Sequence, residues 1–500
     1  MNSAANPVSD GQVGLRTPAT SFAAFMSLCI AWMMVLPLFA GPDEPANFIK
    51  SAAVVRGEFV GKPIDASTTT SFWSTYVDID AQFGTAQQVP WCFVGQPQTP
   101  ACDKPLSSLT AVEPSRTDMG RYPALGFLPA GVGTLVGPTD VGARAARLTA
   151  AVACCALLTW SAELLRRRRR SLIPLLVATT PGVVFLSSVS SPSGLEISAA
   201  IAAWTAAWIA ISEGWKSMST ITAFVTAASL LIVARPAGLL TVGVMLAAAA
   251  TTSLRALVSG IAAAWKRFLW LIVAVIASSA WYLGVYDENF GVSLVVESRI
   301  DSLSTVLSRS LVDLPRLVGE SIGNFGWLDT PSPMFVVWGS VAGCAALAWG
   351  AFVGADSRTK LAVALTIAAV PVWLVALNSN YQELLGTFGA QGRHLTPFLV
   401  GIPLAASLRR LPQRTDSTAV ALFILANGWC VLVALRRYSL GAGGDDLLGF
   451  VRNPAWSPPL GMAATLGVVL LAHVIAYLLL RSCARVSPTD ALLRAGRMER

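Results

Sequence analysis

Apolar runs that are long enough to form membrane-spanning helices recur along almost the whole chain, and they limit its fold more than any other feature. A bilayer core is crossed by roughly 20 apolar residues in a helix, which satisfies its backbone hydrogen bonds internally. Hydrophobic residues make up 54% of the sequence, and charged residues make up 13%. The sequence therefore predicts an all-α polytopic membrane protein.

The first predicted span covers residues 21–40, and the second covers about 145–165. The other predicted spans lie near residues 171–188, 194–211, 219–234, 237–253, 268–284, 334–353, 361–377, 396–408, 417–435 and 459–480. These runs predict about 12 transmembrane helices in one domain over residues 20–480. Residues 1–19 are expected to form a disordered cytoplasmic tail, and residues 481–500 a basic cytoplasmic tail.

Five consecutive arginines, at positions 166–170, set the expected orientation of these spans. Basic residues concentrate in the cytoplasmic loops of membrane proteins. If the apolar runs at 123–137 and 145–165 both crossed the membrane, the arginines would lie outside. We therefore expect residues 123–137 to lie on the outer face or dip into it, without spanning.

The net charge of +8 follows from this orientation, because the basic residues gather at the predicted cytoplasmic joints. The arginine block is expected to contact anionic membrane lipids, and no nucleic-acid partner is expected. The sequence contains no zinc-ligand spacing, P-loop or dinucleotide fingerprint. It predicts a multi-pass membrane protein with both termini cytoplasmic.

Two long polar segments form the predicted outer loops, at residues 41–143 and 285–333. In the second loop, residues 303–320 carry apolar side chains at helical spacing, which predicts an amphipathic helix. This helix either lies in the membrane interface or packs on the other outer loop. Cys92 and Cys102 lie in the first loop, outside every apolar run, and are expected to form a disulfide in an oxidising compartment. Two free thiols are the alternative.

Asp43 and Glu44 follow the first predicted span directly and are bracketed by Pro42 and Pro45. Neither proline fits a helix interior, so the span should end there and a new segment should begin. Two carboxylates held at a membrane boundary indicate a positioned functional pair. An ordinary helix end with solvated charges remains the alternative.

Further polar residues are expected at the outer ends of the spans. Arg235, followed by Pro236, stands in a tight turn between two apolar runs, where a lone charge is costly without a partner or a role. A structural salt bridge and a ligand explain this arginine equally well. The outer set comprises Asp43, Glu44, Arg121, Arg144, Glu196, Arg235, Asp329, Arg393 and His394. Several arginines beside two carboxylates suit a phosphate-bearing ligand with a reacting hydroxyl nearby.

Four motifs together resemble a bacterial membrane-protein family, the "domain of unknown function" family 2142, which is common in actinobacteria. The motifs are Pro42–Asp43–Glu44–Pro45 with Phe48, then Arg235–Pro236, Phe325–Gly326–Trp327–Leu328–Asp329–Thr330 and Gln391–Gly392–Arg393. The resemblance covers about residues 20–440, and its first motif is the most specific. That family is similar to the GT-C glycosyltransferases, which use polyprenyl-phosphate sugars on the outer face of the membrane.

The resemblance implies a GT-C-like fold, with juxtamembrane helices in the outer loops and a catalytic carboxylate at Asp43 or Glu44. Three departures from the family pattern stand in this chain. Asn47 replaces a usual histidine, His394 replaces a usual tyrosine, and Ser191–Pro192–Ser193 replaces an Asn-Pro-Asp-like motif, which leaves Glu196 as the only acid nearby. The missing aspartate counts against a metal site. No cofactor is specified, and a divalent cation stays open.

The predicted activity is therefore transfer of a sugar from a polyprenyl-phosphate donor to an envelope glycan or lipid acceptor, with inversion. Asp43 is the expected base and Glu44 its neighbour or replacement. Arg235 and Arg393 are expected to bind the donor phosphate, with help from His394 or Arg121, while Arg144, Glu196 and Asp329 support the site. A flippase for lipid-linked sugars and a non-catalytic assembly protein are the alternatives.

Overall fold

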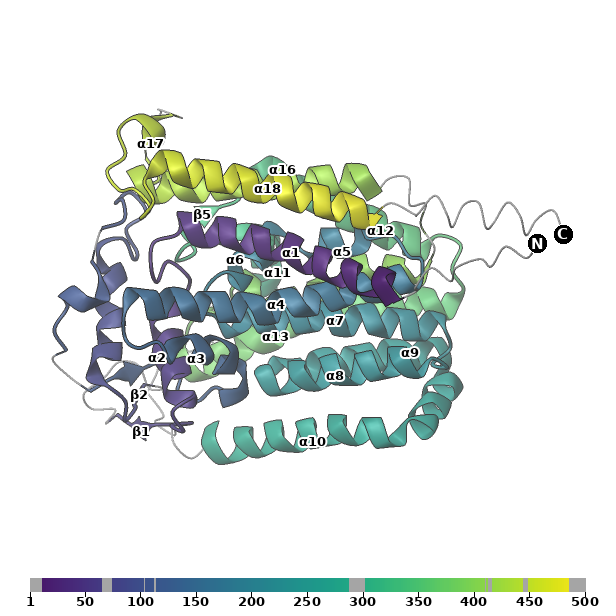
Figure 1. Cartoon of the computed structure of the whole chain (residues 1–500). Coiled ribbons are helices and arrows are strands. Elements are labelled where there is room, and N and C mark those ends of the chain that lie inside the picture. Colours follow the sequence, from purple (N-terminus) through teal and green to yellow (C-terminus); the bar gives the residue numbers. More distant parts are fainter. Residues whose placement is uncertain are drawn as a thin grey trace, which may run out of the picture.

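Long helices that run side by side make up most of the protein (Figure 1). The computed structural model describes residues 11–64, 74–102, 104–111, 114–286, 302–409, 411, 416–443 and 448–484. Within these ranges, nine helices are long and apolar enough to cross a membrane. They are α1 (Gly11–Val35), α4 (Asp140–Arg167), α7 (Pro192–Ser212), α9 (Ala237–Ala263), α10 (Trp265–Trp281), α12 (Met334–Phe352), α13 (Ser357–Leu385), α16 (Asp416–Leu440) and α18 (Met462–Ala484).

The other three predicted spans differ from continuous long helices. The run at 219–234 forms α8 (Met218–Ala234), a helix of 17 residues. The run at 171–188 is split into α5 (Ile173–Ala178) and α6 (Pro181–Ser187), because Pro181 lacks the N–H that a continuous helix needs. The run at 396–408 is divided among α14 (Gly392–Leu399), α15 (Gly401–Leu404) and the 3-10 helix η5 (Ala405–Leu408).

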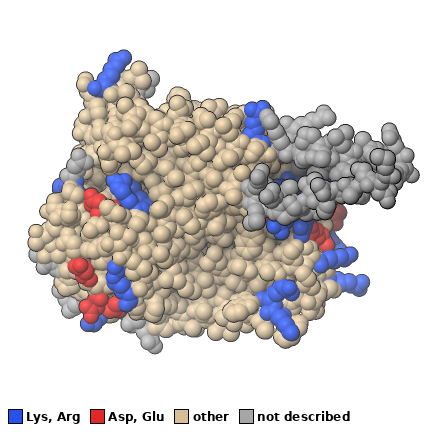
Figure 2. Space-filling view, in the orientation of Figure 1, with Lys and Arg blue, Asp and Glu red and all other residues tan. Residues whose placement is uncertain are grey.

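The two ends of the bundle carry different elements, and we name them the terminal face and the loop face. At the terminal face α1 begins and α18 ends, since the hydroxyl groups of Thr20 and Ser21 each lie 3.4 Å from Cys483 Sγ. At the loop face lie α2 (Glu44–Val54), α3 (Leu128–Thr134) and α17 (Gly449–Arg452) (Figure 1). Charged side chains gather toward both ends in Figure 2, and a broad uncharged band separates them.

Short elements fold the first outer loop around α2. Its strands β1 (Lys62–Pro63), β2 (Thr75–Tyr76) and β3 (Arg116–Thr117) form an antiparallel sheet in that order, with Thr75 opposite Thr117. Three 3-10 helices, η1 (Ala81–Cys92), η2 (Leu106–Ser108) and η3 (Ala124–Phe127), complete the loop. Two contacts tie the loop to α2: Thr117 Oγ1 donates to Ala46 O at 2.7 Å, and Lys50 Nζ donates to Gly120 O at 3.0 Å.

The segment between this loop and α4 is too short to cross a bilayer. At about 2.0 Å per residue for the four residues of the 3-10 helix η3 and 1.5 Å for the seven of α3, the segment reaches about 18 Å, well short of the roughly 30 Å of a bilayer core. The start of α4 lies at the loop face, where Asp140 Oδ1 accepts from Leu106 N at 2.8 Å. The short segment agrees with the expectation that residues 123–137 do not span.

The predicted tails and second outer loop are described in part. Residues 11–19 are helical in α1, so the expectation of a disordered tail over 1–19 is wrong for this part, because a helix gains one hydrogen bond per added residue once it is nucleated. Residues 1–10 and 485–500 lie outside the described residues. The predicted amphipathic helix is present as α11 (Leu303–Gly323), which packs against α13 and α14. A small hairpin follows, with β4 (Asn324–Phe325) and β5 (Thr330–Pro331), whereas residues 287–301 lie outside the described part.

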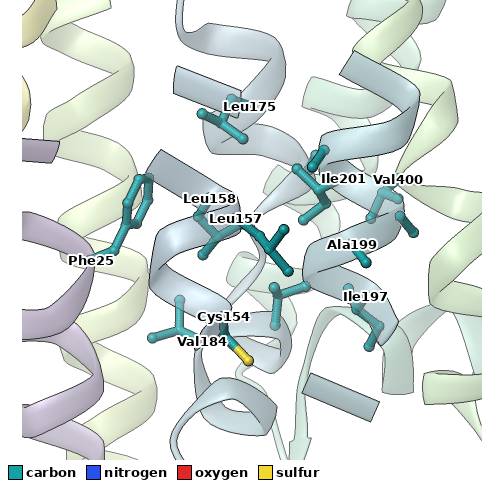
Figure 3. Packing of buried hydrophobic residues seen from close by; sticks show 14 of the residues in the cluster. Phe25, Cys154, Leu157, Leu158, Leu175, Val184, Ile197, Ala199, Ile201 and Val400 are labelled. Atoms are coloured by element: carbon teal, nitrogen blue, oxygen red, sulfur yellow. The ribbon is translucent and has the colours of Figure 1, made fainter. Parts of the chain in front are cut away.

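The helix α7 lies at the centre of the core. Figure 3 shows Ile197 and Ile201 of α7 facing Leu157 and Leu158 of α4, with Phe25 of α1 beside them. Two buried indoles of α7 bind the broken segment across from it: Trp204 Nε1 donates to Pro397 O, and Trp208 Nε1 donates to Gly401 O, each at 3.0 Å. These bonds tie the broken segment to α7 inside the core.

Candidate functional site

Asp43 marks the turn from α1 into α2. Its backbone is left-handed, with φ 55° and ψ 16°, and it immediately precedes the first residue of α2. Pro45 fits the first turn of the helix, where the missing N–H costs nothing. The left-handed residue sends the side chains of Asp43 and Glu44 to different surroundings, so the two adjacent acids have separate roles.

The carboxylate of Asp43 forms an ion pair with Arg393. Arg393 Nη2 donates to Asp43 Oδ2 at 2.6 Å, and Arg393 Nη1 donates to the carbonyl of Pro42 at 3.4 Å. The Asp43 side chain is 40% exposed, whereas that of Arg393 is 9% exposed. The arginine is therefore held in the protein and orients a carboxylate that water or a ligand can reach.

Arg235 ends α8 and reaches back over the start of α7. Its Nη2 donates to Ser193 Oγ at 3.1 Å, and its Nε lies 3.8 Å from Glu196 Oε2. The guanidinium stands 4.6 Å from the centre of the Tyr122 ring, a distance typical of a cation–π contact. Both the salt bridge and the ligand interpretation of Arg235 remain compatible with these contacts, because 3.8 Å is a loose ion pair.

His394 follows Arg393 in the first turn of α14. Gln391 N donates to His394 Nδ1 at 3.2 Å, so a neutral ring carries its proton on Nε2. Burial, together with the positive charges of Arg393 and Arg235, lowers the pKa of His394 well below its usual value. The ring stacks on Tyr381 with centroids 6.4 Å apart. His394 can thus donate a hydrogen bond from a neutral ring. It carries no positive charge that could balance a phosphate, so its expected role changes from charge balance to hydrogen bonding.

These side chains surround a polar cavity of about 470 Å³ at the loop face. Asp43, Arg235, Arg393 and His394 line it, together with Asp118. The other lining residues are Pro45, Ala46, Gln87, Pro90, Trp91, Val94, Met119, Tyr122, Trp327, Tyr381, Gly389 and Gln391. Six separate sequence regions therefore contribute to one cavity, although no local rule brings them together.

A second, largely apolar cavity of about 500 Å³ adjoins the first. Four residues line both cavities: Tyr122, Arg235, Tyr381 and His394. The second cavity extends between helices past Pro236, Ala237, Leu239, Leu240, Ser278, Ser279, Tyr282, Leu283, Trp373, Ala376, Leu377 and Asn380, and it also contains Arg121 and Glu196. Leu240 is 51% exposed and Leu283 is 69% exposed, so the apolar side reaches the surface of the bundle.

Glu44 does not line either cavity. It is 1% exposed and accepts from Arg147 Nε and Nη2, both at 2.7 Å. Its carboxylate also accepts from Gly41 N at 2.9 Å and from Ser190 N at 3.0 Å. The structure thus gives Glu44 a structural position that joins α2 to α4, because every oxygen is already engaged. This position does not agree with the expectation that Asp43 and Glu44 form a functional pair, with Glu44 as the neighbour or replacement of the base.

Asp329 likewise lies apart, in a buried ion pair with Arg437. Arg437 Nη2 donates to Asp329 Oδ2 at 2.7 Å, and the guanidinium also donates to the carbonyls of Phe93, Gln96 and Thr99. Those carbonyls belong to a loop closed by the Cys92–Cys102 disulfide, whose Cα atoms are 6.4 Å apart. Asp329 therefore supports the wall of the polar cavity indirectly, by holding the arginine that this loop surrounds.

The remaining predicted site residues are distributed unevenly. Arg121 is buried in the apolar cavity, with its guanidinium 5.5 Å from the Tyr122 ring. Glu196 lines the same cavity, whereas Arg144 lines neither cavity. In the part of the chain that is described, no group of three His, Cys, Asp or Glu side chains could hold a metal ion.

Several residues of the site were not predicted from the sequence. Tyr122 and Tyr381 stand between the two cavities, and Asp118 adds a second carboxylate to the polar one. Tyr122 directly follows Arg121, so the Arg–Tyr–Pro start of that segment was an available signal. Arg437 ends an apolar run, where a buried charge is itself a signal.

Comparisons with known proteins place the chain in a family. No curated protein matches the sequence. Two crystal structures of ArnT from Cupriavidus metallidurans are similar to it. The apo state is 14% identical with a TM-score of 0.43 over 91% of this chain and 74% of ArnT. The form bound to undecaprenyl phosphate is 13% identical with a TM-score of 0.44 over 95% of this chain and 77% of ArnT. The model of the family described as "Predicted membrane protein (DUF2142)" matches residues 26–402, and the chain belongs to that family.

Proposed function

We propose that this protein is a membrane glycosyltransferase that moves a sugar from a polyprenyl-phosphate donor to an envelope glycan or lipid acceptor. One observation carries the proposal: a polar cavity with a reachable carboxylate adjoins an apolar cavity, and Arg235 and His394 stand at their junction. A lipid-linked sugar has the same order of parts, with an apolar chain, then a phosphate, then a polar sugar.

The apolar cavity suits the polyprenyl chain. Leu239, Leu240 and Leu283 line it and are partly exposed on the side of the bundle, where a lipid tail can enter from the bilayer. Burial of apolar lipid surface contributes about 25 cal/mol per Å². This cavity therefore supplies affinity for the tail without demanding any particular sugar.

The junction suits the phosphate. Arg235 offers a guanidinium whose only ion-pair contact among the described residues is the loose one to Glu196, and His394 offers Nε2–H. Arg393 is already paired with Asp43 in the polar cavity, whereas Arg121 lines the apolar cavity beside the junction. Glu196 is the one acid among the described residues that line the apolar cavity. Two guanidinium groups and the N–H of His394 therefore outweigh one carboxylate there, which favours an anion at the junction.

The reaction that fits these positions is a single displacement. Asp43 accepts the proton of an acceptor hydroxyl through Oδ1, while Arg393 holds Oδ2. The acceptor oxygen then bonds to the anomeric carbon as the bond from that carbon to the phosphate oxygen breaks. The electron pair leaves with the polyprenyl phosphate, whose charge Arg235 stabilises. Attack from the side opposite the leaving group inverts the anomeric centre, and no step requires a metal ion.

The polar cavity suits the acceptor. Trp91 lines its wall and is 66% exposed, and Gln87, Asp118 and Gln391 offer hydrogen bonds. The loop face is then the extracytoplasmic face of a bacterial plasma membrane. The arginine block at the end of α4 and the start of α1 support this orientation, because both lie at the opposite end of the bundle (Figure 1).

The test compares Asp43→Asn with Asp78→Asn in a strain that lacks the native gene. Asp78 is exposed in the first outer loop and lines neither cavity, so it controls for loss of an acidic group in this loop. Loss of a general base lowers a rate by about 10²–10⁴-fold. We expect Asp43→Asn to leave a truncated envelope glycan and accumulated donor lipid on the outer leaflet, and Asp78→Asn to restore the wild-type glycan.

A second variant separates donor binding from chemistry. Arg235→Ala should raise the donor KM more than it lowers kcat, because it removes a phosphate partner. Transfer by Asp43→Asn at the wild-type rate would refute the proposal. Donor lipid that stays on the inner leaflet in the deletion strain would instead identify a flippase.

A further inference from the structure

Trp91 exposes a large aromatic side chain at the wall of the polar cavity. It is 66% exposed, although it stands between Pro90, which is buried, and Cys92, which is disulfide-bonded. Contact of this much apolar surface with water is unfavourable, but single exposed apolar residues are common on proteins. What distinguishes Trp91 is the rigidity of its backbone and the chemistry of the groups around it.

The backbone that follows Trp91 is fixed to the end of α16. The Cys92–Cys102 disulfide closes this loop, and Arg437 donates to three of its carbonyls. Phe93 is 1% exposed and packs edge-on against Tyr438, with ring centroids 5.4 Å apart. A side chain on a fixed backbone loses little further conformational freedom when it binds a ligand, so the indole is preorganised for contact.

The indole belongs to the polar cavity and not to the apolar one. Trp91 and Trp327 both line the polar cavity, and neither lines the apolar cavity. Among the described residues that line the apolar cavity, none comes from residues 81–102. The first outer loop also lies beyond the ends of the long helices, at the loop face (Figure 1). Exposed tryptophans are frequent at the headgroup level of membranes, but this indole lines a polar cavity instead.

The other groups of the polar cavity suit a carbohydrate. A sugar ring presents C–H groups on its face and hydroxyl groups around its edge. The π face of an indole carries a negative partial charge, which attracts the C–H groups and covers the apolar face of the ring. Gln87 and Asp118 line the same cavity and offer an amide and a carboxylate for the hydroxyl groups. A lipid tail would instead bury these polar groups against apolar surface.

We propose that the acceptor is a carbohydrate, and that one of its rings stacks on the indole of Trp91. The assignment depends on the proposed transferase function, and it selects the glycan from the two acceptor classes. Asp43 lines the same cavity, so a ring on Trp91 and a hydroxyl at Asp43 can belong to one oligosaccharide. The disulfide and Arg437 then serve acceptor binding, because they hold the segment that carries Trp91.

Binding is measured on the full-length wild-type protein in detergent, without donor, so that no transfer occurs. The probe is the water-soluble oligosaccharide fraction that mild acid releases from the envelope of the deletion strain. Saturation-transfer NMR reports which sugar protons lie close to the protein, and a titration gives the affinity. The variants are Trp91→Ala and Trp91→Phe. Phe59→Ala is the matched control, because Phe59 is also an aromatic residue of the first outer loop, is 51% exposed and does not line the cavity.

We expect the wild type to bind the oligosaccharides, with the strongest saturation transfer to C–H protons of a sugar ring. Trp91→Ala should weaken binding about tenfold or more, the change that loss of an aromatic contact of about 1.4 kcal/mol produces. Trp91→Phe should retain most of the affinity, and Phe59→Ala should bind as the wild type does. In a transfer assay with the lipid extract of the deletion strain as donor, Trp91→Ala should raise the KM for the oligosaccharides and leave the KM for the donor lipid unchanged.

The outcomes separate the carbohydrate acceptor from the transferase function. Transfer to the lipid fraction of the same cells, and not to the oligosaccharides, would overturn the carbohydrate acceptor and keep the transferase. Oligosaccharide binding that depends on Trp91, without transfer to either fraction, would support the carbohydrate site and refute the transferase. Failure of the wild type to bind the oligosaccharides would overturn the proposal. Equal weakening in Phe59→Ala would also overturn it, since the contact would then be unspecific.

Discussion

The change Glu44→Gln tests whether the acid next to Asp43 is structural. Glu44 and Arg147 are each 1% exposed, and they form a two-pronged ion pair with both N–O distances at 2.7 Å. Glutamine keeps the size of the side chain but replaces one oxygen by an NH₂ group. One orientation sets this group against Arg147 Nε and Ser190 N, and the other sets it against Arg147 Nη2 and Gly41 N. Either orientation places donors against donors and leaves the arginine without its counter-charge.

The expected loss of stability is large. Removal of one partner from a buried ion pair costs about 3–5 kcal/mol, because an uncompensated charge stays buried. That loss lowers the ratio of folded to unfolded protein by about 10²–10⁴-fold. A double change to apolar residues, Glu44→Leu with Arg147→Met, should not restore stability. It would leave Gly41 N and Ser190 N without an acceptor and would remove the donors that bind the carbonyls of Leu36 and Pro37.

The assay is heat denaturation of detergent-solubilised protein, with the folded fraction measured by size-exclusion chromatography. Asp78→Asn is the control, because Asp78 is exposed in the first outer loop and lines neither cavity, so its change should affect stability little. We expect Glu44→Gln to unfold at a clearly lower temperature than either the wild type or the control. A Glu44→Gln protein that is as stable as the wild type and yet fails to transfer sugar would refute the reasoning, since Glu44 would then act in catalysis.

Three further predictions concern the outer loop and the orientation of the bundle. Val141 and Arg167 are exposed at opposite ends of α4, and each is changed to cysteine in a protein without the free cysteines. A membrane-impermeant thiol reagent added outside the cell should label Val141→Cys and not Arg167→Cys. The reverse pattern would show that the topology is opposite to the one proposed. Burial lowers the pKa of Lys50 to about 7 from an ordinary 10.5. Between pH 7 and pH 10.5, Lys50 is therefore protonated in the unfolded chain but neutral in the folded protein, so the free energy of unfolding rises with pH. The wild type should therefore gain up to about 1.4 kcal/mol per pH unit relative to Lys50→Met, and parallel pH curves would contradict this. Cys92→Ser should cost about 2–3 kcal/mol through the opened loop, and a reductant should then destabilise the wild type but not the variant.

The sequence predicted the membrane-spanning character of the chain because apolar run length is a local property. The sequence could not distinguish the role of Asp43 from that of Glu44. The left-handed backbone of Asp43 directs the two side chains to different surroundings, and no sequence pattern shows this. Asp43 meets Arg393 in the polar cavity, and Glu44 meets Arg147 in the core. Both partners are distant in the sequence, so no pattern near the acids assigns them.

The interrupted spans show a similar limit. The run at 171–188 is apolar throughout, and hydropathy alone predicts one helix there. Pro181, with Thr180 as its cap, divides the run into α5 and α6. The breaks are tolerated because they are buried among other helices, where groups such as Trp204 Nε1 bind carbonyls of the broken segments. Such partners belong to the tertiary structure and cannot be found from the composition of the run.

The contacts of the first outer loop with Arg437 and Arg393 can form only late in the synthesis of the protein. Gln96, whose carbonyl binds Arg437, precedes it by 341 positions, and Asp43 precedes Arg393 by 350. At about 5–20 residues per second, synthesis of the intervening chain takes roughly 20–70 s. During this time the first outer loop is already synthesised but lacks both arginines. The loop must therefore avoid proteases and incorrect partners on its own, and the proposed active site closes only when the later helices have been inserted.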